Sequence, residues 1–290
     1  MKIFHGTGVA LVTPFDANLE IDYKGLSKLL EFTAPEVDYF VVQGTTGEST
    51  TTSTNEKLDI LDFVLNNNVR QLPIVYGIGG NDTNAVIETI KQTKLDGVDA
   101  ILSVSPYYNK PTQEGIFQHY TLIANNSPVP VILYNVPGRT MSNISPETTI
   151  RLSQHSNIIG IKEASGNLEQ CMQIMAGKPA DFMLISGDDM LTTSMMSIGA
   201  AGVISVLANG FPSNFKRLTH AALKGKFQLS REATEQLLSI NSLMYLESNP
   251  VGIKEVLQQK KICSNHVRLP LISASQTLKA AIKITLNQMA

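Results

Sequence analysis

The sequence predicts an α/β fold in which a closed barrel is followed by a C-terminal helical extension. Eight short apolar runs rich in Val and Ile recur along the chain, and longer amphipathic stretches separate them. This alternation is typical of βαβ units in a parallel sheet. A doubly wound sheet normally has fewer strands, whereas eight βα units match a barrel. The predicted fold is therefore a (β/α)₈ TIM barrel.

Local signals place strands and helices along this pattern. Ser53 with Glu56 three residues later forms a predicted capping box, in which two side chains satisfy backbone N–H groups at a helix start. Ser145, Pro146 and Glu147 form another start, with proline at the first helical position. The predicted strands are the apolar runs at residues 8–12, 39–42, 73–76, 100–104, 131–134, 158–162, 182–186 and 202–206.

Beyond Pro212 the strand pattern stops and helical periodicity continues. Leu237, Ile240 and Met244 have the spacing of one helical face. We therefore expect a barrel over residues 1–222 and a helical region over residues 223–290, with no linker or internal repeat.

Composition favours a small-molecule partner. A chain of 290 residues with 43% apolar and 17% charged residues can bury a large core. A net charge of −2 without a long Lys/Arg run is not that of a nucleic-acid or anionic-membrane binder. The apolar stretch 9–12 is too short for a signal segment or a membrane span, so we expect a cytoplasmic protein.

Neither a metal nor a cofactor is implied by the sequence. Cys171 and Cys263 lie far apart, so we expect small core residues rather than a disulfide or thiolate site. The five histidines have no metal-binding spacing. Residues 77–80 do not begin a dinucleotide motif, because Asp82 occupies the position of the final glycine.

The catalytic groups of such a barrel lie where the strands end, which draws attention to Lys162. It closes the sixth run, whose other residues are apolar, and Glu163 follows it. Burial disfavours the ammonium ion and lowers the pKa of a lysine, and a neutral amine is a nucleophile toward carbonyls. The alternative is that Lys162 pairs with a carboxylate, such as Glu163, and holds the barrel rim together.

Tyr134 ends the fifth run, on the strand next to Lys162. A phenol beside an amine can deliver and remove the protons that imine formation requires. Core packing with a hydrated hydroxyl is the alternative for a tyrosine in this position.

The second run leads into the segment GTTGES at residues 44–49. Its two glycines free the backbone to turn N–H groups toward an anion, between two hydroxyl groups, so a carboxylate would fit. The alternative is a surface turn, because residues 50–54 continue the Thr/Ser-rich composition.

Two further strand ends carry polar groups. Tyr107 and Tyr108 follow the fourth run, and paired loop tyrosines are more often part of an interface than catalytic. Arg139, just after the fifth run, offers a planar fork suited to a carboxylate, with a surface salt bridge as the alternative.

In this order, the segments resemble the dihydrodipicolinate synthase and N-acetylneuraminate lyase superfamily over almost the whole chain. Asn249-Pro250 also resembles a family feature. The matching blocks are GTTGES at 44–49, PYYNKPTQEG at 106–115, LYNVPGRT at 133–140, GIKEA at 160–164, SGDD at 186–189 and GVISV at 202–206.

The resemblance implies a role for each block. Lys162 would form a Schiff base with pyruvate, whose carboxylate Thr45 and Thr46 would bind. Thr45, Tyr134 and Tyr108 would relay protons, Tyr108 from the neighbouring subunit of a tight dimer. The family is typically a homotetramer, a dimer of dimers. The resemblance also implies that the backbone carbonyls of Gly187 and Ile204 line the pocket.

Arg139 carries the choice of second substrate. By resemblance it would bind the carboxylate of L-aspartate 4-semialdehyde, because sugar-acid members do not usually keep an arginine followed by threonine here. The implied reaction is a condensation followed by cyclisation, on the route to diaminopimelate and lysine. The alternatives are an N-acetylneuraminate lyase, a 2-keto-3-deoxy sugar acid aldolase, or a non-catalytic barrel that binds a keto acid.

One departure from the family concerns regulation. Lysine-inhibited members typically carry histidines after GTTGES and a glutamate after the glycine-rich turn, where this chain has Thr54, Lys57 and Ala85. A cationic effector would lose its carboxylate partner and meet a like charge. We therefore expect weak or absent inhibition by lysine.

Overall fold

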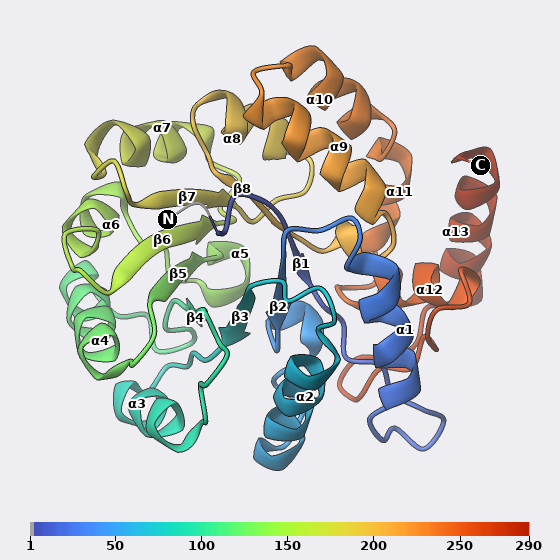
Figure 1. Ribbon diagram of the computed structural model, residues 1–290, viewed down its shortest axis with the longest axis horizontal. Coiled ribbons are helices and arrows are strands. Elements are labelled where there is room, and N and C mark those ends of the chain that lie inside the picture. The colour runs from blue at the N-terminus through green and yellow to red at the C-terminus, as the bar shows by residue number, and fades with distance from the viewer. Residues whose placement is uncertain (1–2, 290) are drawn as a thin grey trace.

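Eight parallel strands close into a barrel in which each strand pairs with the next and β8 pairs with β1 (Figure 1). The computed structural model describes residues 3–289. The strands are β1 (Gly6–Ala10), β2 (Tyr39–Val42), β3 (Ile74–Gly77), β4 (Ala100–Val104), β5 (Val131–Asn135), β6 (Ile158–Glu163), β7 (Met183–Ser186) and β8 (Gly202–Ser205). The predicted barrel is thus confirmed, with strand ends displaced by one or two residues.

Helices surround the barrel and continue beyond it (Figure 1). Those that follow β1 to β8 are α1 (Tyr23–Thr33), α2 (Thr54–Asn67), α3 (Thr83–Gln92), α4 (Gln113–Asn126), α5 (Pro137–Thr140), α6 (Pro146–Leu152), α7 (Leu168–Gly177), α8 (Thr192–Ser197) and α9 (Pro212–Leu223). Short 3₁₀ turns follow β2 and β8, namely η1 (Thr45–Gly47) and η2 (Leu207–Asn209). The C-terminal helices are α10 (Phe227–Glu235), α11 (Leu238–Met244), α12 (Val251–Gln259) and α13 (Gln276–Met289).

Both predicted helix starts are present. In α2 the Ser53 N–H donates to Glu56 Oε2 at 2.7 Å and the Glu56 N–H donates to Ser53 Oγ at 3.3 Å. In α6 the Thr148 N–H donates to Ser145 Oγ at 3.2 Å, and Pro146 is the first helical residue. The two bonds at α2 and the one at α6 satisfy N–H groups that have no partner inside the helix.

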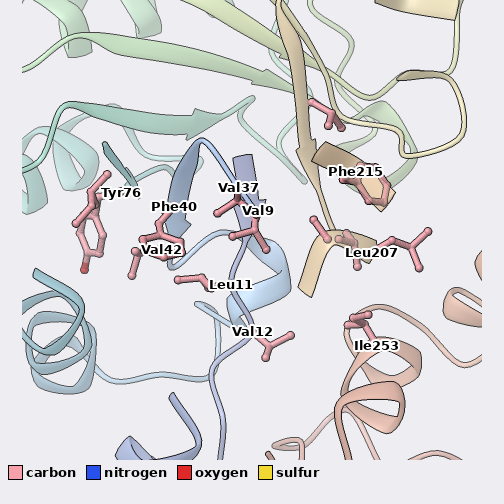
Figure 2. Packing of buried hydrophobic residues seen from close by; sticks show 14 of the residues in the cluster. Val9, Leu11, Val12, Val37, Phe40, Val42, Tyr76, Leu207, Phe215 and Ile253 are labelled. Atoms are coloured by element: carbon pink, nitrogen blue, oxygen red, sulfur yellow. The ribbon is translucent and has the colours of Figure 1, made fainter. Parts of the chain in front are cut away.

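Alternating side chains divide the core into two layers. On β2, Phe40 and Val42 point outward to the helices, whereas Val41 points into the barrel. Figure 2 shows part of the outer layer, in which Val9, Phe40 and Val42 belong to the same buried cluster as Leu207 and Phe215. The same alternation on β5 and β6 decides which polar side chains face the barrel interior.

The lack of a side chain at Gly202 lets the backbones of β8 and β1 approach closely enough for the barrel to close. A Cβ atom built there would lie 1.9 Å from the carbonyl oxygen of Gly6, on the partner strand β1. That contact is impossible without a shift of one strand, so β8 and β1 can pair in this register only with glycine at this position.

We therefore expect Gly202→Ala to destabilise the barrel. Overpacking against backbone should lower the free energy of unfolding by about 2 to 3 kcal/mol, measured by urea denaturation. Gly138→Ala is the control, because a Cβ there meets nothing within 4 Å. Equal stabilities for the two variants would contradict this account of closure.

Candidate active site

Lys162 lies on the inner face of the barrel, near the C-terminal end of β6. It is 6% exposed, and its strand partner on β5 is Tyr134. The Nζ atom lies 4.4 Å from the centroid of the Tyr134 ring. The expected adjacency of amine and phenol is therefore present.

Glu163 does not pair with Lys162, because the alternation of the strand directs the two side chains to opposite faces. The carboxylate is satisfied by neutral donors: Asn135 Nδ2 and Gln170 Nε2 donate to Oε2, each at 2.9 Å, and the Ser165 N–H donates to Oε1 at 2.7 Å. None of the ion pairs within residues 3–289 includes Lys162. The interpretation of Lys162 as a rim salt bridge is therefore wrong.

Glycine at position 187 leaves room for the lysine side chain. A Cβ built at Gly187 would lie 3.1 Å from Lys162 Cε and 2.6 Å from Ala164 Cβ. Ile204, on β8, belongs to the apolar cluster inside the barrel and is 1% exposed. Both predicted lining residues thus lie at the inner wall.

The GTTGES segment is not a surface turn. Thr46, Gly47 and Glu48 are buried, and the Gly47 carbonyl accepts a hydrogen bond from Thr13 Oγ1 at 2.6 Å. Asn249 Nδ2 donates to Thr46 Oγ1 at 3.1 Å, across 203 residues of sequence. The segment is therefore a fixed turn at the C-terminal end of β2, with Thr45 only partly buried.

A cavity of about 510 Å³ begins at this turn and extends outward between α2 and α3. Thr45, Tyr107 and Tyr134 line this cavity together with Lys57 of α2 and Ala85 of α3, whereas Lys162 does not line it. Its size and its mixture of phenol, hydroxyl and apolar groups are those of a small-molecule site.

Two predicted site residues are exposed within this single chain. Tyr108 is 87% exposed, has a φ of 74°, and is absent from the lining of the cavity that reaches Thr45 and Tyr134. Arg139 is exposed on α5, which begins two residues after β5 ends. No ion pair within the described chain involves Arg139.

Asp189 is a further polar group at this end of the barrel, to which the sequence assigned no role. It is 3% exposed, and its Oδ2 accepts the Leu207 N–H at 2.9 Å. Burial raises the pKa of this carboxyl to about 6, although hydrogen bonds from Ser205 and Leu207 oppose the rise. Asp188 and Asp189 lie just after the end of β7, much as Lys162 lies near the end of β6. Because the catalytic groups of a barrel lie where its strands end, this placement could have identified them from the sequence.

Tyr245, directly after α11, joins the same region. Although the residue as a whole is 46% exposed, desolvation of its phenol raises the pKa, the negative charges of Asp189 and Asp188 raise it further, and Arg139 acts in the opposite direction. No local pattern marks this tyrosine, because a helix end far along the chain supplies it.

Within residues 3–289 no group of three or more His, Cys, Asp or Glu side chains is placed to hold a metal ion. No helix in that range is long and apolar enough to cross a membrane. Cys171 and Cys263 are buried free thiols, as predicted, and burial raises the pKa of each to about 12.

These features define a class of protein. A buried amine that forms no ion pair in the described part of the chain, beside a phenol at the C-terminal end of a parallel barrel, is the arrangement of lysine-dependent lyases that act through a Schiff base.

Comparison with known proteins gives the family. The model of the dihydrodipicolinate synthetase family matches residues 3–289. A 4-hydroxy-tetrahydrodipicolinate synthase of Cytophaga hutchinsonii is 50% identical over 98% of both chains. The crystal structure of dihydrodipicolinate synthase from Thermotoga maritima superposes with a TM-score of 0.96 at 34% identity, covering 99% of both chains. That of the Acinetobacter baumannii enzyme, complexed with pyruvate, has a TM-score of 0.95 at 35% identity and covers 98% of both chains.

The chain therefore belongs to the dihydrodipicolinate synthetase family. It is an enzyme of the lyase class, and the resemblance deduced from its motifs is confirmed.

The raised pKa of Asp189 has a consequence for stability. Between the ordinary aspartate pKa of 3.8 and about 6, the folded protein binds a proton that the unfolded chain has released, so this group lowers stability as pH rises through that window. We therefore compare the free energy of unfolding of Asp189→Asn with that of the wild type. The difference should favour the variant by roughly 1 to 3 kcal/mol more at about pH 7 than at about pH 4. Urea denaturation at both pH values measures this. A difference independent of pH would contradict it.

Proposed function

We propose that the chain is a 4-hydroxy-tetrahydrodipicolinate synthase, which condenses pyruvate with L-aspartate 4-semialdehyde. The observation that carries the proposal is the buried amine of Lys162, which forms no ion pair within residues 3–289 and lies against the ring of Tyr134. The names of the relatives agree with it.

The first half-reaction makes a nucleophile from pyruvate. The amine nitrogen of Lys162 attacks the keto carbon, the carbinolamine loses its hydroxyl as water, and an imine forms. Loss of a proton from the methyl carbon then gives an enamine. Tyr134, Thr45 and the partner subunit's Tyr108 relay the protons, and Tyr134 is already in contact with the amine.

The pyruvate carboxylate binds at the turn of residues 44–49. The hydroxyls of Thr45 and Thr46 and the N–H groups of the turn are its donors, and the carbonyls of Gly187 and Ile204 complete the wall near Lys162. Anchoring the carboxylate fixes the keto carbon relative to the amine, which supplies the proximity that the attack requires.

The second half-reaction joins the enamine carbon to the aldehyde carbon of the semialdehyde. The amino group of the bound product then displaces Lys162 at the imine carbon, which closes the ring and releases the enzyme amine. Arg139 binds the semialdehyde carboxylate at the mouth of the site. Its exposed position on α5, free of ion pairs within the described residues, supports this role.

The active assembly is proposed to be a cytoplasmic homotetramer built from two tight dimers. Tyr108 is 87% exposed and Tyr107 38% exposed on one loop, and large exposed aromatic side chains are typical of interfaces. A proton relay that includes Tyr108 is complete only when a partner subunit supplies it.

The related aldolases of sialic and deoxy-sugar acids are the alternative activity. A polyhydroxylated chain requires hydroxyl-binding groups where Arg139 stands, so the arginine favours the carboxylate-bearing semialdehyde. A non-catalytic keto-acid-binding barrel is disfavoured because nucleophile and relay groups are kept together.

Turnover with each substrate set tests the proposal. We expect product from pyruvate and aspartate semialdehyde, and none from N-acetylneuraminate. Arg139→Ala should raise the KM for the semialdehyde about 10- to 100-fold, because one charge-assisted contact is lost. Arg151→Ala is the control, since Arg151 pairs with Glu114 on the helix surface. Activity confined to the sugar acid would overturn the assignment.

Weak feedback by lysine is a second expectation. Ala85 and Lys57 line the cavity beside the turn of residues 44–49, and its lining includes one carboxylate, the exposed Asp82, whose Oδ1 accepts the N–H groups of Asn84 and Ala85. An effector ammonium therefore meets Lys57 and only a carboxylate that already caps α3. We expect most of the activity to remain at about 1 mM L-lysine. A dissociation constant of about 1 mM corresponds to about 4 kcal/mol of binding free energy, and we expect lysine to bind more weakly than that. Inhibition of more than half at that concentration would contradict this.

A further inference from the structure

The start of α12 contacts the carboxylate-binding turn of residues 44–49 at two points. Lys254 Nζ donates to Glu48 Oε1 at 2.5 Å, and Asn249 Nδ2 donates to Thr46 Oγ1 at 3.1 Å. More than 200 residues of sequence separate the partners of each pair. A segment outside the barrel thus holds a turn at the barrel mouth.

The Lys254–Glu48 pair is buried, and both side chains have further hydrogen-bond partners. Its side chains are 0% and 2% exposed. Lys254 also donates to the His266 carbonyl at 2.7 Å and lies 4.2 Å from the ring centroid of Phe15, while the second oxygen of Glu48 accepts the Arg268 N–H at 3.1 Å. Because both charges are desolvated, each holds the other in one position, and loss of either leaves a buried charge unpaired.

Glu48 occupies a backbone conformation that needs support. Its φ of 53° and ψ of 37° are left-handed, and it ends the turn η1, which carries Thr45 and Thr46. Non-glycine residues adopt this conformation only when surrounding contacts determine it. The ion pair and the Arg268 N–H are two of those contacts, beside the hydrogen bonds of the Glu48 backbone to Thr45 and Thr51.

The contact between Asn249 and Thr46 determines where the hydroxyl hydrogen of Thr46 can point. Since the Thr46 oxygen accepts the Asn249 N–H, its own hydroxyl hydrogen remains for another acceptor. A keto-acid carboxylate in the turn is such an acceptor.

We propose that Lys254 and Asn249 are positioning residues for the pyruvate carboxylate, and that the C-terminal helical region is thereby part of the active site. This inference rests on the proposed function. Lys254 touches no substrate: it acts through Glu48 on the turn, and Asn249 acts through the Thr46 hydroxyl.

Kinetics separate positioning from stability. Lys254→Met and Glu48→Gln should each lower kcat/KM for pyruvate about tenfold, mainly through KM, because a displaced turn misplaces the keto carbon. The double variant removes both buried charges, so its melting temperature should recover toward the wild type while KM stays raised. Asn249→Ala should also raise KM for pyruvate.

Asp38→Asn is the matched control at the opposite end of the barrel. Asp38 precedes β2, accepts the Thr7 N–H at 2.7 Å and contacts His220 Nε2 at 3.0 Å. This variant should lower the melting temperature and leave KM for pyruvate unchanged.

The outcomes are distinct. Raised KM in the double variant at a recovered melting temperature supports the proposal. The proposal is overturned if the folded single variants Lys254→Met, Glu48→Gln and Asn249→Ala all keep the wild-type KM for pyruvate. It is also overturned if both the KM and the melting temperature of the double variant return to the wild-type values. A wild type that turns over neither substrate set refutes the proposed function instead.

Discussion

The site depends on a buried amine that forms no ion pair within residues 3–289. Alternation along β6 directs Ile161 outward, Lys162 inward and Glu163 outward, so the acidic neighbour is bound by Asn135 and Gln170 on the far side of the strand. The closed barrel then surrounds Lys162 with apolar walls and the ring of Tyr134. Pairing with Glu163 would convert the same lysine into a structural ion pair, and the chemistry proposed for it would be lost.

Other parts of the chain act on this amine by fixing what surrounds it. The parallel barrel brings the ends of β2, β5, β6 and β7 to one rim, so residues far apart in sequence meet there. Beyond β8, the chain returns to that rim at the start of α12, where it holds the Thr45–Gly47 turn. The C-terminal helices therefore serve the site as well as the stability of the barrel.

Strong local signals made much of this predictable. Apolar runs gave all eight strands, the Ser53 capping box gave the start of α2, and neighbouring strands gave the approach of Tyr134 to Lys162. Long-range pairing was not predictable. The Glu48–Lys254 pair joins charges 206 residues apart, and nothing in either segment specifies the partner. The orientation of Glu163 needed the register of β6, because a shift of one residue reverses every side chain.

The most direct measurement is reduction with borohydride in the presence of pyruvate, followed by mass spectrometry of the digested protein. The account predicts one reduced three-carbon adduct, located on the peptide that contains Lys162, and none when pyruvate is omitted. An unmodified Lys162 peptide, or an adduct on Lys57 or Lys254 instead, would contradict it.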